Sequence, residues 1–183
     1  MTRTPVRTGE LQGLLDALAG QRAHVLRSLE GLGEAELRRG VLPSGWSCLG
    51  LVNHLARDVE RFWFRAVLGG EGEAAIAAGD AWTVDPERPA ADVLDGYRRD
   101  TARADEVLAR LDPDAEPAWW PDGLFGAWRL DSARQVVLHV ITETACHAGH
   151  LDAVRELLDG RQDLVLTSGG GGRGGAEGEP RCG

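Results

Sequence analysis

The sequence predicts an all-α protein, an antiparallel four-helix bundle with a long aromatic loop before its last helix. Three observations predict it. Apolar residues recur at three- and four-residue steps in four separate segments. No segment of useful length alternates apolar and polar residues as a half-buried strand does. The connections between the segments are rich in glycine and proline, which favour turns and end helices.

The first two long helices are expected over residues 10–30 and residues 47–68. Leucines at helical spacing define the first, which ends in a glycine-rich turn. One further short helical turn is expected over residues 34–39. Ser47 is a suitable N-cap for the second long helix, and Gly69 is a suitable stop.

The last two long helices are expected over residues 89–111 and 132–159. A connection over residues 71–89 contains at most one short helix, and Gly160 ends the last helix. Between the two helices lies an aromatic loop, residues 112–130. Its tryptophans either wall a pocket or cover the end of the bundle; they are Trp119, Trp120 and Trp128.

The domain organisation is expected to be simple. A chain of 183 residues can bury one core without disulfides or metal staples. Residues 1–166 are expected to form the bundle. Residues 167–183 are mostly glycine and polar residues that cannot bury enough apolar surface to order themselves, so a flexible glycine-rich tail is expected.

Charge and cysteine content limit the partners and the compartment. The formal net charge of −9 argues against nucleic acid and against an anionic membrane surface. No apolar run approaches the roughly 18 residues of a membrane span, and the N-terminus lacks the apolar stretch of a signal peptide. Cys48, Cys146 and Cys182 are an odd number without CxxC spacing, which suits a reducing compartment. We therefore expect a cytoplasmic protein.

A cluster of ionisable side chains lies in the last expected helix. Glu143, His147 and His150 are spaced four and three residues apart, so at about 100° per residue they share one helical face. Val136 and Val140 fall on that face too, so the polar groups are expected in the middle of a core stripe. A buried carboxylate has to be protonated, paired or bound to a cation.

His54 is the histidine that best completes a metal site with this helix. The only other histidine outside the helix, His24, is expected to face solvent. His54 points away from the apolar stripe of its own helix, alongside Asp58, so it either lies on the surface or faces a polar cleft. With Glu143 and His147 it supplies two imidazoles and one carboxylate. Catalytic zinc sites use such sets because they leave positions open for water or substrate.

Two neighbouring residues are weaker candidates for this metal site. His139, one turn before Glu143, either orients a ligand by a hydrogen bond or is an ordinary packed histidine. Cys146 is expected to be a small buried residue and not a ligand. The nucleophile-elbow, P-loop, dinucleotide-binding and HExxH motifs are absent.

Four stretches resemble the DinB-like metal-binding four-helix bundles, in the actinobacterial branch of mycothiol S-transferases and mycothiol-dependent maleylpyruvate isomerase. The resemblance covers roughly residues 10–160. The stretches are Trp46-Ser, Leu51-Val-Asn-His54-Leu-Ala, Val59-Glu-Arg-Phe-Trp63 and Glu143-Thr-Ala-Cys-His147-Ala-Gly-His-Leu-Asp152.

The resemblance implies a divalent metal, often zinc, held by a histidine of the second helix and a pair of the last helix. Position by position, these ligands are His54, Glu143 and His147. Many relatives carry glutamine where this chain has His150, which implies a pocket residue or a partner of a ligand there. Many also carry arginine where this chain has Cys146, so substrate preference does not carry over with the motif.

The resemblance implies a function as well. It is thiol activation, in which a metal-bound low-molecular-weight thiol such as mycothiol attacks an electrophilic small molecule. A homodimer is implied too. The alternatives are another metal-dependent hydrolase, isomerase or lyase of specialised metabolism, and a non-catalytic bundle that binds a metal or small ligand, with Glu143 protonated in the core.

Overall fold

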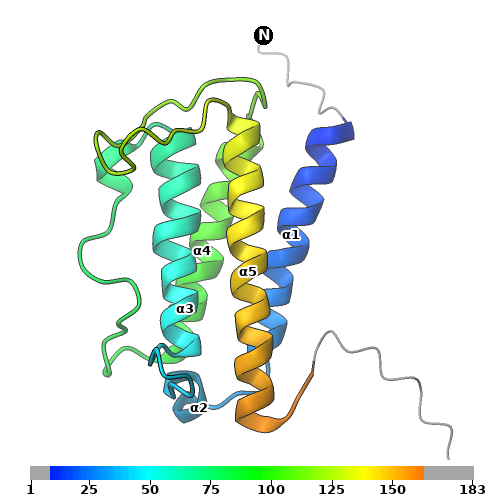
Figure 1. Ribbon diagram of the computed structural model, residues 1–183, viewed down its shortest axis with the longest axis vertical. Coiled ribbons are helices and arrows are strands. Elements are labelled where there is room, and N and C mark those ends of the chain that lie inside the picture. Colours follow the sequence, from blue (N-terminus) through cyan, green and yellow to red (C-terminus); the bar gives the residue numbers. More distant parts are fainter. Residues whose placement is uncertain (1–8, 163–183) are drawn as a thin grey trace, which may run out of the picture.

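A computed structural model describes residues 9–162, and all regular secondary structure in that range is helical, with no strand. The expectation of an all-α bundle is confirmed. The long helical segments lie side by side (Figure 1). The elements are α1 Gly9–Leu29, α2 Glu34–Arg38, α3 Cys48–His54, η1 Leu55–Leu68, η2 Gly72–Ala75, α4 Ala90–Leu108 and α5 Ala133–Asp159.

Local sequence signals explain where the helices begin and end. Ser47 caps α3, because its hydroxyl accepts from the backbone N–H of Gly50 at 3.1 Å. Ser132 caps α5 in the same way. Gly160 ends α5 in the left-handed conformation, with φ of 77°. The predicted tail, residues 167–183, lies outside the described residues.

The helices form two pairs. In α1 and α5, Glu10 pairs with Arg134, and Ser28 donates to Asp152 at 2.9 Å. The first contact joins the starts of the two helices and the second joins residues near their ends, so α1 and α5 run in the same direction. The α3–η1 helix and α4 also run together, opposite to the first pair (Figure 1). The long crossover between Leu68 and Ala90 permits this order, because it returns the chain to the end of the bundle at which α3 begins.

The predicted helix over residues 47–68 is present, but its winding changes. After the α-helical segment α3, the chain continues without a break into η1, which is a π-helix. Its hydrogen bonds reach five residues back, as from the N–H of Gly69 to the carbonyl of Phe64 at 2.8 Å. Such wide turns are rare and frequently occur at functional sites. His54 stands at the junction of the two segments.

A buried ion pair links α1 to η1. Glu60 is 1% exposed. Its two oxygens accept from Nε and Nη2 of Arg22, the first at 2.7 Å. Arg22 also donates to Asp105 of α4 at 2.7 Å. Three helices are therefore joined through one guanidinium group.

His24 is buried rather than exposed, so the expectation that it faces solvent is wrong. It is 7% exposed, and its Nε2 lies 2.9 Å from a carboxylate oxygen of Asp152. The physical reason is the packing of α1 lengthwise along α5, which covers this face of α1. None of the described helices combines the length and apolar character that a membrane crossing requires.

Glu34 fastens the short helix α2 to the start of α4, and its effect is expected to depend on pH. Its carboxylate accepts from the N–H of Ala90 at 3.0 Å and from Nε of Arg38 at 2.7 Å. These bonds, that of Ala90 first, hold its pKa below the ordinary value of 4.5. A carboxyl with a lowered folded pKa stabilises above its unfolded pKa, and this stabilisation is lost as pH falls through the folded pKa.

Glu34→Gln is therefore expected to flatten the decline of the unfolding free energy below pH 4.5. Denaturant unfolding from about pH 3 to pH 6 measures this decline. Glu87→Gln is the matched control, since Glu87 is exposed and its carboxylate makes no hydrogen bond within residues 9–162. Equal slopes for wild type and Glu34→Gln would contradict the prediction.

Candidate functional site

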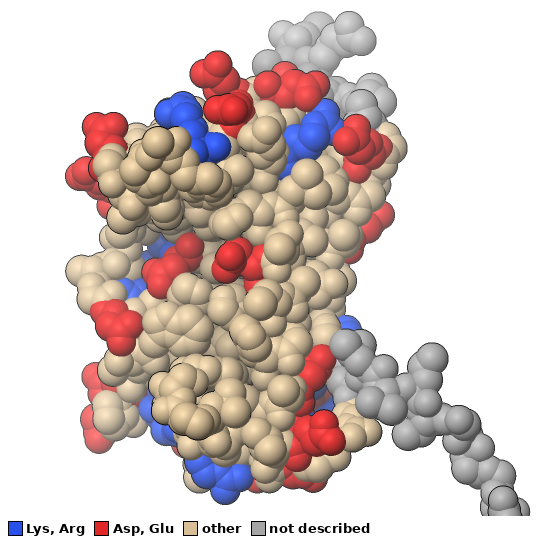
Figure 2. Space-filling view, in the orientation of Figure 1, with Lys and Arg blue, Asp and Glu red and all other residues tan. Residues whose placement is uncertain are grey.

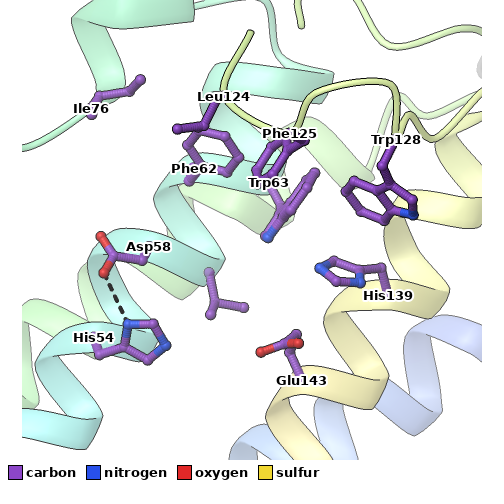
Figure 3. Close-up of a pocket in the computed structure, with 11 residues that line it drawn as sticks. His54, Asp58, Phe62, Trp63, Ile76, Leu124, Phe125, Trp128, His139 and Glu143 are labelled. Atoms are coloured by element: carbon purple, nitrogen blue, oxygen red, sulfur yellow. Dashed lines mark hydrogen bonds and ion pairs between the residues drawn. The ribbon is translucent and has the colours of Figure 1, made fainter. Parts of the chain in front are cut away.

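A cavity of about 450 Å³ opens between the α3–η1 helix and α5. Its size lies within the range of small-molecule sites, about 300–1,000 Å³. Figure 3 shows His54 and Asp58 on one side, Glu143 and His139 on the other, and aromatic side chains along the wall between them. The remaining lining residues are Val59, Phe62, Trp63, Ile76, Leu124, Phe125 and Trp128.

His54 is held in one orientation by two contacts. Its Nδ1 lies 2.9 Å from a carboxylate oxygen of Asp58, one turn further along the helix. Its ring stacks on Trp82, with the ring centroids 4.3 Å apart. When Nδ1 donates to the carboxylate, Nε2 keeps its lone pair for a ligand. This carboxylate–imidazole arrangement is common behind metal-binding histidines.

Glu143 and His147 meet His54 from α5. Nε2 of His147 lies 3.6 Å from a carboxylate oxygen of Glu143, and the His147 ring centroid lies 5.1 Å from that of His54. Burial, and then the neighbouring His54, lower the pKa of His147 below 6.5. The neutral imidazole, which is the form that binds metals, is therefore favoured at neutral pH.

The structure brings the three predicted ligands together without arranging them as a finished metal centre. Across residues 9–162, no set of three histidine, cysteine, aspartate or glutamate side chains is placed to hold an ion as it stands. His54 and Glu143 line the cavity, whereas His147 lies next to both of them but outside the cavity lining. The residues nevertheless fit a zinc-type ion chemically, because two imidazoles and one carboxylate lie close together. Nδ1 of His147 is also buried without a hydrogen-bond partner. The ligand set of His54, Glu143 and His147 stays a prediction.

Glu143 is not buried in a core stripe, so that expectation is wrong. Its side chain is 40% exposed. The buried line of α5 runs instead through Val140, Thr144 and Ala148, and it continues to Leu151. The reason is that α5 packs most extensively on α1, which turns Glu143 to the edge of the core, where it faces the cavity.

The two further histidines of α5 occupy different surroundings. His139 lines the cavity, and its ring packs edge-on against Trp63 with centroids 4.6 Å apart. Burial lowers the pKa of His139. His150 is exposed, with its ring 6.3 Å from that of Trp46, and it does not line the cavity. His150 is nevertheless a neighbour of His147, with ring centroids 5.7 Å apart, so a role for it beside a metal ligand stays a prediction.

The thiols of the described residues do not line the cavity. Cys48 is buried, and burial raises its pKa to about 11. It is therefore a protonated, unreactive thiol at neutral pH. Cys146 is exposed, so the expectation of a small buried residue is wrong; Cys182 lies outside the described residues.

Both alternatives for the aromatic loop hold, for different residues. Phe125 and Trp128 form part of the cavity wall. Trp119 and Trp120 pack over η1 instead. The ring centroid of Trp119 lies 6.4 Å from that of Phe62, and the ring centroid of Trp120 lies 5.9 Å from that of Trp63.

Asp58 and Trp82 contact His54 but were not among the predicted site residues. For Asp58, the spacing of four residues from His54 was a usable signal, because such residues are neighbours on a helix. Trp82 lies in the crossover after η2, where no periodicity indicates which way a side chain points. Its stacking on His54 required the fold.

The charge around the cavity is acidic or neutral on the face that Figure 2 shows. Acidic side chains border the hollow in the middle of this face, and the surface around it is mostly uncharged. The carboxylates at the cavity belong to Asp58 and Glu143. Such a site favours a cation beside the carboxylates and an uncharged group against the aromatic wall.

These features define a class of protein, an all-helical bundle with two histidines and a carboxylate from two helices at a small-molecule cavity. The family model of mycothiol-S-transferase matches residues 13–160. The chain belongs to the mycothiol-S-transferase family, which confirms the resemblance seen in its motifs. Comparison with curated proteins and with solved structures gave no match.

Proposed function

We propose that the protein is a metal-dependent thiol S-transferase that joins a low-molecular-weight thiol, mycothiol or a close analogue, to an electrophilic small molecule. The observation that carries the proposal is the meeting of His54, Glu143 and His147 beside an aromatic cavity in a chain of this family. The odd number of cysteines, their lack of CxxC spacing and the thiol cosubstrate favour a cytoplasmic location. A homodimer stays an expectation.

The proposed ligands of the metal, zinc in the first instance, are His54, Glu143 and His147. A zinc-type ion bound there lowers the pKa of a coordinated thiol, so that the thiolate is present at neutral pH. Asp58 fixes the tautomer of His54 through its hydrogen bond to Nδ1. This hydrogen bond leaves Nε2 unprotonated and ready to act as a ligand.

The aromatic wall has the second role, which is to seat the electrophile. Trp63, Phe125 and Trp128 line the cavity between the sides that carry Asp58 and Glu143 and give it an apolar wall. In the reaction, the sulfur–carbon bond forms as the bond from carbon to the leaving group breaks. The leaving group departs with that electron pair, and the thiol proton passes to solvent. The substrate is therefore expected to be largely apolar with one displaceable group.

The test is turnover of an aromatic halide electrophile by zinc-loaded protein, with and without mycothiol. The thioether product is expected only when protein and mycothiol are both present. Turnover that ignores the thiol would overturn the proposal in favour of metal-dependent hydrolysis or isomerisation. Metal analysis of the same samples tests the site: wild type is expected to hold one ion per chain, and both His54→Ala and Glu143→Ala to hold less.

A further inference from the structure

A second cavity, lined largely by arginine, lies on the other side of the α3–η1 helix. Its volume is about 340 Å³, and it shares no lining residue with the first cavity. It is enclosed by α3, η1, the crossover segment and α4. Its charged lining consists of one aspartate and five arginines, namely Asp100, Arg57, Arg61, Arg88, Arg99 and Arg103. In a chain with a formal net charge of −9, this is a local reversal of sign.

Most of this positive charge forms no salt bridge within residues 9–162; Asp80 acts on Arg57, and Glu71 on Arg103, only through longer-range attraction. Asp100 is 4% exposed and pairs with Arg61 at 2.6 Å, and it also lies 3.4 Å from Arg65, which is outside the lining. The other four lining arginines form no salt bridge with any residue from 9 to 162; they are Arg57, Arg88, Arg99 and Arg103. Like charges that share a low-dielectric space repel one another, so the cavity favours an anion.

Neutral partners hold two of these arginines in place. Arg57 donates to backbone carbonyls of the crossover, including that of Gly79 at 3.2 Å. Arg88 donates to the side-chain oxygen of Asn53 at 3.3 Å and to the carbonyl of Asp92 at 3.1 Å. Carbonyl and amide oxygens fix the direction of a guanidinium and leave its charge unpaired. In addition, Nε of Arg57 is buried without a hydrogen-bond partner.

Gly96 provides room for the cluster within α4. A Cβ atom at this position would lie 3.0 Å from Nη2 of Arg88 and 3.8 Å from Nη2 of Arg99. Two guanidinium groups therefore reach the same point beside the helix. Glycine is unfavourable in a helix interior, and here its missing side chain lets these groups approach.

We infer that this arginine cavity binds a small polyanion that carries phosphoryl groups. Guanidinium groups bind phosphate oxygens in pairs of parallel hydrogen bonds, and several of them converge here. The enclosed volume suits a small molecule rather than a polymer, since it lies near the lower end of the usual range of about 300–1,000 Å³. Because the cavity lies apart from the proposed metal centre, the inference does not depend on the proposed reaction.

Titration calorimetry with inorganic pyrophosphate tests the inference, with orthophosphate and a nucleoside diphosphate as further arms. One pyrophosphate per chain is expected to bind. Tighter binding of the nucleoside diphosphate would identify a phosphorylated metabolite as the ligand, and equal or weaker binding would identify the inorganic anion. Arg99→Gln and Arg103→Gln are each expected to weaken binding roughly tenfold; both side chains are exposed, so the variants should fold.

Arg98→Gln is the matched control, because Arg98 neighbours Arg99 on α4 but pairs with Asp95 outside the cavity. It is expected to leave binding unchanged. His54→Ala separates the two sites, and it too is expected to bind pyrophosphate like wild type. Absence of binding at millimolar concentration, an equal loss in Arg98→Gln, or a loss confined to His54→Ala would overturn the inference.

Discussion

Glu60→Ala is expected to lower the free energy of unfolding by about 3–5 kcal/mol, the usual cost of leaving one partner of a buried ion pair alone. Arg22 donates two hydrogen bonds to Glu60, which is 1% exposed. Without that carboxylate, the guanidinium stays in the interior with only the exposed Asp105 as an acidic partner. Urea unfolding followed by circular dichroism measures the change.

Two controls identify the cause of this loss. The double variant Arg22→Met/Glu60→Leu removes both charges and is expected to recover most of the stability, since apolar replacements of buried pairs are often neutral or stabilising. Glu71→Ala removes an exposed carboxylate that pairs with Arg65, and it is expected to cost about 1 kcal/mol or less. A loss for Glu60→Ala no larger than that for Glu71→Ala would contradict the prediction.

Glu60 also illustrates which parts of the fold the sequence could not predict. The apolar stripe of residues 47–68 was visible, and so were the caps at Ser47 and Ser132. The buried glutamate was not, because a single stripe describes a helix that packs on one side. The α3–η1 helix packs against α1, α4 and α5, so nearly all of its circumference is covered, and a charged residue was buried with it.

The candidate site was predictable where helix geometry alone placed the side chains. Glu143 and His147 share a face of α5 by their spacing, and His54 points away from the apolar stripe of its own helix. Helical spacing also predicted a deeper burial of Glu143 than the structure has. Spacing alone does not say against which neighbouring helix an amphipathic face packs. The path of a loop depends on tertiary contacts, so the stacking of Trp82 on His54 could not be predicted.

The largest expected effect on activity is that of His147→Asn. If the proposed site is correct, this variant loses a metal ligand and keeps a side chain of similar volume. Thiol-dependent turnover is expected to fall by more than about 100-fold, together with bound zinc, because losing a ligand exceeds the roughly 10–100-fold cost of losing a ligand's hydrogen-bond partner. Metal analysis and kcat/KM with mycothiol, measured on the same preparations, report the two effects.

Asp58→Asn and His150→Asn are expected to lose less zinc and less turnover than His147→Asn, so the three variants together form a graded test. Asp58 accepts from His54 at 2.9 Å but is not a proposed ligand, so its variant is expected to lose roughly 10–100-fold in zinc affinity or activity. His150 is exposed on the same helix, with its ring 5.7 Å from that of His147, and is not a proposed ligand, so its variant is expected to keep both. A metal centre built on His54, Glu143 and His147 requires the order His147, Asp58, His150. Equal losses in all three variants would indicate a general disturbance of the packing between η1 and α5. Full zinc occupancy in His147→Asn would show that the ion is held elsewhere.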